Sequence, residues 1–449
     1  MKIFSTYSIK IKHYNHIFKE TVRCYRLAVD FFVEIALKEW ETLQEIPSLN
    51  LRQSCMEQLC VRTSKRPMPL YPFEDARKVF YKFPCYLRRA AINEALGKVS
   101  SYKSNLENWE NTPVVSRGKM PSKPCAGNVY PVLYRKAMYQ RENPYQASIK
   151  VFTRNTWDWL TVDLNKGDVD YITHHCLSRK ECAPTLQKRG HEWFLDFPFE
   201  ENVKLATTPI EDTIAIAVDL GINNACACSA MLADGTIVAR KILNLPTEKD
   251  SLNHAINRIK KAQRVGNHKM PRLWAKAKGI NQHIAVLTAQ YIIDFAILYS
   301  ADVIVFEHLD LKGKKKGGKK QKLHLWKAQT VQALVTHKAH RYGMRVSRVN
   351  AWGTSALAFD GSGRVERGTY LQDGIEKYNY SICTFTTGKI YNCDLNASYN
   401  IGARYFIRER LKSLSETIRL GIEAKVPQCT KRTTCTLSDL ISLNAVMGA

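Results

Sequence analysis

This sequence lacks an apolar run long enough to cross a membrane. The longest candidate, 284–306, is interrupted by Asp294 and Asp302, whereas a membrane-spanning helix needs about 20 mostly apolar residues. The opening residues MKIFSTYSIKIKH alternate apolar and polar side chains and contain no apolar signal-peptide core. We therefore expect a cytoplasmic protein with no membrane partner.

Disulfide and zinc patterns are also missing. The 13 cysteines are scattered along the chain and form no CxxC pair. A secreted disulfide scaffold would instead carry regularly spaced cysteines in a short chain. The distribution is typical of free thiols in a reducing compartment.

Acidic residues are scarce relative to basic ones. The 449 residues include 67 Lys and Arg but 41 Asp and Glu, which gives a formal net charge of +26. The basic residues are spread over the whole chain instead of gathering on one amphipathic segment, which argues against a membrane surface as the partner. This charge predicts a polyanionic partner, and nucleic acid in particular.

The first half of the sequence predicts a sheet with helices inserted into it. Residues 1–12 alternate as in a half-buried strand, and residues 14–110 have helical periodicity. Prolines punctuate the start of 111–205, and short β-rich runs follow. The chain is long enough for several domains, and we expect a small β-barrel or sheet that takes the N-terminal strand as a member.

One predicted helix in this half has a basic face. After Pro84, apolar residues recur at three- and four-residue steps, as in an amphipathic helix. The basic residues of the opposite face are Arg88, Arg89, Lys98 and Lys103. Ordinary solvent exposure explains each of them singly, and contact with a nucleic acid is the alternative at this net charge.

From residue 213 onward the predicted order of elements is β-β-β-α-β-α-β-α. The first strand, Ile214–Asp219, is apolar at every position before the acid, as in a strand buried on both faces. Gly221 lets the backbone turn sharply and come close to whatever Asp219 holds. The segment 312–322 contains seven lysines and no acid, so we expect a surface loop there. We expect 352–390 to be irregular.

Three carboxylates stand at the ends of predicted elements. Asp219 ends the first strand, Glu307 ends the fourth, and Asp394 opens the last helix. A mixed sheet with its first and fourth strands adjacent would bring them together. Converging carboxylates repel one another unless cations lie among them, and their hard oxygens suit Mg²⁺ or Mn²⁺. Two such ions about 3.5–4 Å apart would serve the hydrolysis of a phosphodiester.

The segments that carry these acids resemble a known family. AVDLGINN, VIVFEHLDL and YNCDLNASYNIGAR are similar to the three motifs of RuvC-like nucleases. In this form they resemble TnpB, the RNA-guided nuclease encoded by insertion sequences, and the related miniature type V CRISPR effectors. FPCYLRRAAINEALGKVSSYKSNLENW resembles the recognition-lobe helix of that family. The resemblance covers nearly the full chain.

The resemblance implies an α+β multidomain fold, in which a wedge β-barrel holds a helical recognition lobe and an RNase H-like (RuvC) nuclease domain follows. The implied boundaries are 1–12 for the first strand of the barrel, 13–112 for the recognition lobe, 113–210 for the rest of the barrel, 211–350 for the nuclease domain with the first two motifs, 351–390 for a target-nucleic-acid-binding insert, and 391–449 for the third motif and the C-terminal tail.

The activity that the resemblance implies is guide-RNA-directed cleavage of double-stranded DNA beside a short flanking motif. Asp219, Glu307 and Asp394 would be the catalytic ligands of two Mg²⁺ or Mn²⁺ ions. The setting would be a prokaryotic cytoplasm, at the nucleoid when DNA is bound. The loop lysines that would contact the nucleic-acid backbone, unless the loop is simply solvated, are Lys312, Lys314, Lys315, Lys316, Lys319, Lys320 and Lys322. The asparagines that would support the active site, unless they fill ordinary turn and capping roles, are Asn223, Asn396 and Asn400.

One feature of the family is absent. The family usually carries a four-cysteine zinc ribbon between the second and third motifs, and where its first CxxC pair should stand this chain reads TSALAFDGSGRVERG. Only Cys383 and Cys393 lie between 340 and 404, and two thiols cannot complete a tetrahedral zinc site. We therefore expect no structural zinc and an ordinary turn at 360–363.

Two other functions remain open. An RNA-guided DNA-binding regulator would bind without cleavage, but relatives of that kind have lost acids, and all three are present here. An unguided recombinase or junction resolvase is the second alternative. Recombinases of the retroviral-integrase kind order their acids Asp, Asp, Glu, whereas this chain has Asp, Glu, Asp, and resolvases are much shorter. The sequence leaves a monomer or a homodimer open.

Overall fold

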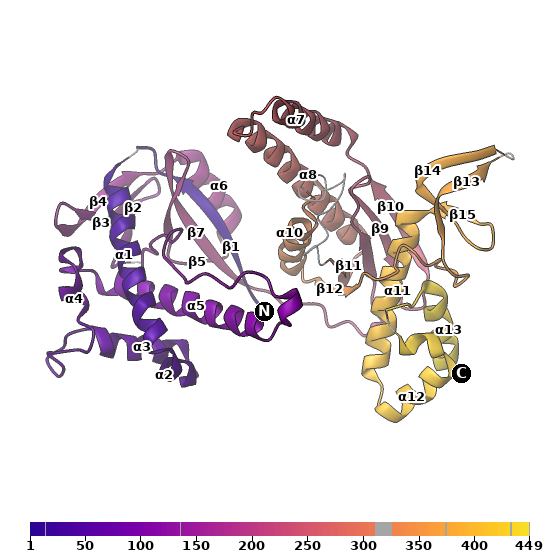
Figure 1. Cartoon of the computed structure of the whole chain (residues 1–449), viewed down its shortest axis with the longest axis horizontal. Helices are drawn as coiled ribbons and strands as arrows, with labels where there is room; N and C mark the ends of the chain where they lie inside the picture. The colour runs from indigo at the N-terminus through magenta and orange to yellow at the C-terminus, as the bar shows by residue number, and fades with distance from the viewer. Residues whose placement is uncertain (14, 135, 310–325, 373–374, 432, 449) are drawn as a thin grey trace. The chain divides into compact units, whose positions relative to one another are not determined.

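The computed structural model describes residues 1–449 except 14, 135, 310–325, 373–374, 432 and 449. The chain divides into two compact units, one formed by Lys2–Glu201 and the other by Asn202–Ala449 together with Met1. Within the described residues the fold is mixed α/β and contains four β-sheets (Figure 1). In that part of the chain, no helix combines the length and apolar character needed to span a bilayer.

The first unit contains two sheets. The N-terminal strand pairs with a strand formed about 190 residues later, which confirms that it joins a sheet made by the β-rich segment. An isolated bridge between Ile11 and Leu164 links the two sheets. The strands of the first sheet are β1 (Lys2–Lys10), β5 (Lys180–Glu181), β6 (Thr185–Arg189) and β7 (Glu192–Asn202), and those of the second are β2 (Tyr139–Asn143), β3 (Gln146–Thr153) and β4 (Thr156–Asp163).

Aromatic rings form part of the helical core of this unit. The Phe73 ring stacks on Phe32 and on Phe80, with ring centroids 5.0 and 4.3 Å apart. Burial of such large rings is a main source of core stability. The backbone amide of Phe152 donates to the Thr21 hydroxyl at 2.9 Å, which ties the first helix to the second sheet. The helices are α1 (Ile17–Lys38), α2 (Trp40–Glu45), α3 (Leu49–Cys60), α4 (Phe73–Ala76), α5 (Cys85–Glu110) and α6 (Lys166–Cys176).

The second unit is built on a five-stranded sheet of order β10-β9-β8-β11-β12. The strands are β8 (Ala215–Asp219), β9 (Cys226–Met231), β10 (Ile237–Leu243), β11 (Val303–His308) and β12 (Arg345–Asn350). β8, β9 and β10 form an antiparallel meander, whereas β11 lies parallel to both β8 and β12. The prediction that the first and fourth strands are adjacent is therefore confirmed.

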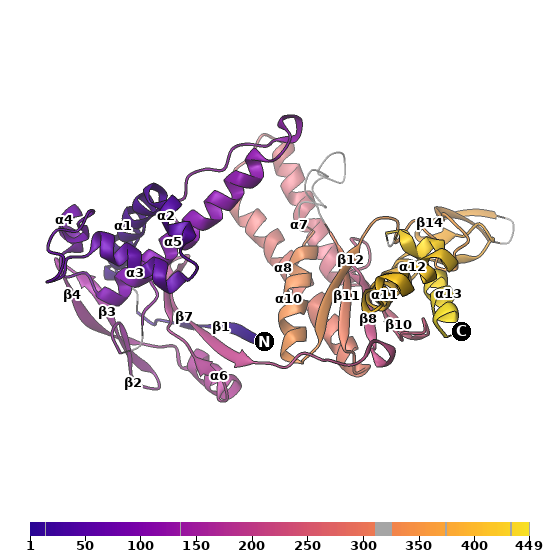
Figure 2. The same cartoon turned by 90° about the horizontal axis from the view of Figure 1, so that it is seen from below.

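Helices cover both faces of this sheet. α11 covers one face, and α8 and α10 cover the other (Figure 2). Ala215 and Ala217 of β8 belong to the core on the α11 side, and the alternate residues Ile216 and Val218 belong to the core on the side of α8 and α10. Because both faces are buried, β8 is apolar at every position before its acid. The helices are α7 (Pro246–Arg264), α8 (Pro271–Leu298), α10 (Ala328–Arg341), α11 (Cys393–Ser413), α12 (Glu416–Lys425) and α13 (Leu437–Gly448).

The segment between β12 and α11 was expected to be irregular, and that expectation is wrong. It contains a three-stranded sheet made of β13 (Glu366–Gln372), β14 (Ile375–Thr384) and β15 (Ile390–Asn392). Aromatic and β-branched residues alternate along 378–384, and the dipeptide Asp-Gly at 373–374 stands shortly before them, which is a strong hairpin signal. The expected turn at 360–363 is confirmed, since Gly361 and Gly363 have positive φ and the Ser362 amide donates to the Asp360 carboxylate.

Candidate active site

Three acidic residues line one cavity at the edge of the five-stranded sheet. β8 and β11 run parallel with Val218 opposite Phe306, so Asp219 and Glu307 each stand one residue beyond that pair. Asp394 lies in the first turn of α11, which Asn392 caps by accepting hydrogen bonds from the amides of residues 394 and 395. Carboxylates from two strands and a helix thus face a cavity of about 650 Å³.

Two glycines allow the backbone to come close at this edge. A Cβ on Gly221 would lie 2.8 Å from the Asn224 carbonyl oxygen, so a side chain there would obstruct the turn after β8. A Cβ on Gly402 would lie 2.8 Å from the Met231 sulfur and 3.2 Å from the Ala217 Cβ. The absence of a side chain at Gly402 therefore lets α11 pack closely on β8 and β9.

The electrostatics of Asp219 reflect this crowding. Burial raises the pKa of Asp219 well above its ordinary value, and the negative charges of Glu307 and Asp394 raise it further, against a smaller lowering by the Arg367 guanidinium. Both burial and like charges disfavour ionisation of a carboxyl. The cavity therefore favours a cation or a proton beside Asp219.

Two hydrogen bonds hold Glu307. The Thr354 hydroxyl donates to its carboxylate, and the Gln332 side-chain amide donates to its backbone carbonyl at 2.9 Å. Burial raises the pKa of Glu307, while the Thr354 hydrogen bond and the Arg404 charge act in the opposite direction. The buried Arg404 in turn donates to the carbonyls of Asn350 and Trp352 at 2.9 and 2.7 Å. The orientation of Glu307 is thus fixed by neutral donors on neighbouring elements.

Asp394 has a cationic partner instead. Its Oδ2 accepts a hydrogen bond of 2.7 Å from the Asn224 side chain, and its Oδ1 lies 3.5 Å from the Arg367 guanidinium. The Arg367 side chain is 36% exposed, and its guanidinium packs 5.0 Å from the centroid of the Tyr380 ring. One oxygen of Asp394 is therefore fixed by the loop after β8, and the other faces a cation from β13.

The donor chemistry of the cavity fits a divalent ion of the Mg²⁺ or Mn²⁺ type, since all three acids supply hard oxygens. In the described part of the chain, no three His, Cys, Asp or Glu side chains already stand in a metal-binding arrangement. One oxygen of Asp394 lies 3.5 Å from the Arg367 guanidinium. An ion would have to replace that contact.

The three asparagines proposed as supports lie in different settings. Asn400 donates 2.9 Å hydrogen bonds to the carbonyls of Thr354 and Leu357. Asn396 donates to the Leu357 carbonyl at 2.9 Å and accepts from the Phe359 amide at 2.8 Å. Both are fully buried and hold the segment that carries Thr354. Asn223 is exposed and lines the cavity itself.

Sequence reasoning missed three residues that contact the acids directly. They are Asn224, Thr354 and Arg367. Asn224 follows Asn223 in the first motif, so the polar pair after the strand was the available signal. Thr354 and Arg367 lie far from the acids in the sequence and in segments with no distinctive pattern, so only the fold reveals their contacts.

The four basic residues of α5 are mostly paired within the protein. Arg89 lies 3.0 Å from the Glu57 carboxylate, Arg88 lies 3.9 Å from it, and Lys98 lies 3.6 Å from Glu94. Lys103 is half-buried. The lysines predicted between 312 and 322 lie outside the described residues.

Comparison with known sequences gives two matches. The profile of the Aq_aa04 family matches residues 5–153, which is less than half of the chain. An uncharacterised protein of Aquifex aeolicus (strain VF5), aq_aa04, is 39% identical over 85 residues. That match covers 19% of this chain and 45% of the relative's length. The family match ends at residue 153, before the three acids.

Comparison with solved structures gives Cas12 type V CRISPR effectors. A Cas12f1 complex with guide RNA and target DNA matches at 14% identity and a TM-score of 0.32, covering 89% of this chain and 98% of that one. CasPhi-2 (Cas12j) bound to crRNA and DNA matches at 9% identity and a TM-score of 0.41, covering 90% of this chain and 91% of that one. C2c1 of Alicyclobacillus acidoterrestris matches at 10% identity and a TM-score of 0.36, covering 86% of this chain and 66% of that one. With TM-scores below 0.5, these matches do not establish a shared fold.

Proposed function

We propose that this chain is an RNA-guided DNA endonuclease that uses Asp219, Glu307 and Asp394 to hydrolyse phosphodiesters. The observation that carries the proposal is that all three acids line one cavity although they lie far apart in the sequence. The formal net charge of +26 supports nucleic acids as the partners. The motifs that resemble TnpB and the miniature type V effectors support a guide RNA and a double-stranded DNA target.

The strand arrangement supports the domain assignment. The order β10-β9-β8-β11-β12, with an antiparallel meander followed by parallel strands, is compatible with an RNase H-like nuclease domain. In the first unit, pairing of β1 with β7 across the helical segment supports a wedge domain interrupted by a recognition lobe. The three-stranded sheet at 366–392 would be the target-nucleic-acid-binding insert.

The three carboxylates would hold Mg²⁺ or Mn²⁺, two ions per site. When bound, such ions activate a water molecule and stabilise the leaving oxygen. The residues around the acids keep them in position. Thr354 and Gln332 orient Glu307, whereas Asn224 orients one oxygen of Asp394. Arg367 balances the charge of Asp394 until an ion replaces it.

The test is a cleavage assay with the RNA that co-purifies with the full chain. That RNA is sequenced, a flanked double-stranded target is designed from it, and Mg²⁺ or Mn²⁺ is added. We expect products with a 5′-phosphate and a 3′-hydroxyl. An intact target despite tight binding would instead indicate a regulator, and the absence of a discrete RNA would indicate an unguided enzyme.

A further inference from the structure

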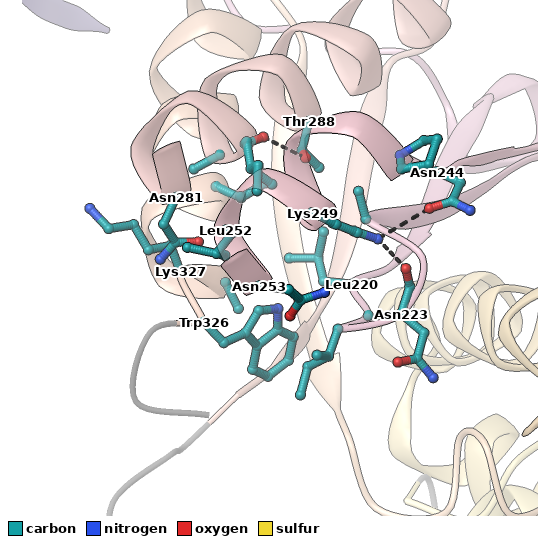
Figure 3. Close-up of a pocket in the computed structure, with 18 of the residues that line it drawn as sticks. Leu220, Asn223, Asn244, Lys249, Leu252, Asn253, Asn281, Thr288, Trp326 and Lys327 are labelled. Carbon is teal, nitrogen blue, oxygen red and sulfur yellow. Dashed lines mark hydrogen bonds between the residues drawn. The ribbon is translucent and has the colours of Figure 1, made fainter. Parts of the chain in front are cut away.

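A second cavity lies next to the carboxylate cavity in the same unit. It has a volume of about 370 Å³, which is within the size range of small-ligand sites, roughly 300–1,000 Å³. The two cavities share the loop 220–223 and Trp326. Figure 3 shows Leu220, Asn223 and Trp326 at the second cavity. A molecule that occupies one cavity is therefore next to whatever occupies the other.

The walls of the second cavity are largely apolar. α7 contributes Leu252 and Ile256, α8 contributes Ile284 and Ala285, and α10 contributes Val331. Trp326, which precedes α10, is half-buried and adds the one large aromatic ring among the residues that line this cavity. An apolar space with an aromatic wall suits a flat, uncharged ring system.

Polar groups lie at its edges. Lys249 donates to the Asn223 carbonyl and lies 3.4 Å from the Asn244 side-chain oxygen, so its ammonium group stands beside the loop shared by the two cavities (Figure 3). The Thr288 hydroxyl donates to the Ile284 carbonyl at 2.8 Å, which leaves its oxygen able to accept. The cavity is also lined by Asp250, Asn253, Asn281 and Lys327.

We propose that this cavity binds the nucleobase of the nucleotide next to the phosphate that lies at the three carboxylates. Trp326 stacks on the base, and Lys249 stands where the strand passes from one cavity to the other. The inference rests on the proposed nuclease function, since it is the scissile strand that enters both cavities. A base must leave its stack to enter such a cavity. The chain should therefore prefer single-stranded or unpaired DNA at this site.

The test is a binding experiment that needs no guide and no cleavage. The probe is a short DNA strand in which one nucleotide carries 2-aminopurine and every other position is abasic, so a single base is available and its register is defined. The full-length chain is titrated in EDTA, and the fluorescence of the probe is followed. An all-abasic strand of the same length serves as the competitor.

We expect the probe to bind saturably. The all-abasic strand should compete for the chain at least ~10-fold less effectively than the strand with one base, because stacking on an aromatic side chain contributes about 1–3 kcal/mol per base. Trp326→Ala should weaken binding of the probe by a similar factor. Trp326→Phe keeps a flat ring and should bind within about threefold of the original chain. Tyr342→Ala removes an exposed aromatic side chain just beyond the other end of α10 and should change nothing.

Unchanged affinity in Trp326→Ala, with a melting temperature equal to that of the original chain, would overturn the inference, as would equal competition by the all-abasic strand. If Trp326→Ala is unstable, the comparison of the two strands on the original chain decides the question alone. Base binding without any metal-dependent cleavage would refute the nuclease function and leave the base site in place, so the two failures are distinguishable.

Discussion

The two cavities beside the loop 220–223 differ in almost every property although they share part of their walls. The larger one contains three carboxylates, held by a threonine, an asparagine and an arginine. The smaller one is lined mainly by the apolar faces of α7, α8 and α10. A single loop after β8 thus lies between a cavity with three carboxylates and a cavity with largely apolar walls. The predictions below test whether the carboxylate cavity acts as proposed.

The largest effect is expected at the centre of the charged cavity. Asp219→Ala removes one of the three converging carboxylates, and we expect cleavage to fall by more than about 100-fold, beyond the usual cost of losing a group that only supports a metal ligand. Binding of RNA and DNA should be unchanged, because no basic group is lost. Initial cleavage rates and filter binding measure the two quantities.

Asp294→Ala is the matched control for that variant. Asp294 is an exposed carboxylate on α8 and does not line the cavity, so this variant has the same change in charge. Cleavage by Asp219→Ala at the rate of the control would show that the acids are misassigned.

The groups that orient the acids should have the next largest effect. Thr354→Val keeps the shape of the side chain but removes the hydroxyl that donates to Glu307. We expect a ~10- to 100-fold loss of cleavage with unchanged binding of nucleic acid. Thr430→Val, which removes an exposed hydroxyl bonded to the Pro427 carbonyl, should retain full activity. Equal rates in the two variants would exclude a positioning role for Thr354.

Arg367 should have a smaller effect, in the opposite direction. Arg367→Gln removes the cation that lies 3.5 Å from Asp394, so less Mg²⁺ should be needed for half-maximal cleavage. The pair is partly exposed, and such pairs contribute ~0.2–1 kcal/mol, so the shift should be at most about fivefold. Arg419→Gln, which removes a partner 3.8 Å from Glu416, is the control. An increased Mg²⁺ requirement would mean that Arg367 assists the ion.

The smallest effect concerns stability without metal. Because the pKa of Asp219 is raised in the folded chain, ionisation of this carboxyl at neutral pH destabilises the fold relative to the unfolded chain. Asp219→Asn should therefore raise the melting temperature in EDTA by about 2–4 °C, the shift expected for ~1 kcal/mol.

The gain in melting temperature of Asp219→Asn should depend on pH. The gain in Asp219→Asn should be full above the raised pKa of Asp219, and it should disappear at pH values below the ordinary value of 3.8, where the carboxyl is protonated in both states. Calorimetry across this pH range measures it. A gain that persists in acid would indicate a packing effect instead of an electrostatic one.

The sequence was sufficient to predict the buried elements at the centre of the second unit. β8 and β11 are short apolar runs that end in an acid, and α11 begins at a carboxylate after a capping asparagine, so their ends were predictable from local chemistry. The adjacency of β8 and β11 followed from the need to bring the acids together. The sheet at 366–392 was missed although Asp-Gly at 373–374 was an available hairpin signal, because alternation is confined to 378–384 and none runs through 366–372.

The convergence of the three acids was predictable from their places at the ends of elements, whereas the contacts made across the fold were not. Thr354 reaches Glu307 because two asparagines of α11 hold its segment by its backbone carbonyls, and nothing in the local sequence marks such a contact. Arg88 and Arg89 give another example, because their shared partner, Glu57 of α3, lies about 30 residues earlier in the sequence and no local pattern marks the pairing.

The close contact at Gly402 sets the register of α11 with respect to the sheet. Asp394 precedes that contact by eight residues, which is about 12 Å along a helix at 1.5 Å per residue. Because each residue turns a helix by about 100°, inserting or deleting one residue between the two positions would swing the third carboxylate out of the cavity while leaving the helix intact. The distance between the glycine and the acid, counted in residues, is therefore as much a part of the site as the acid itself.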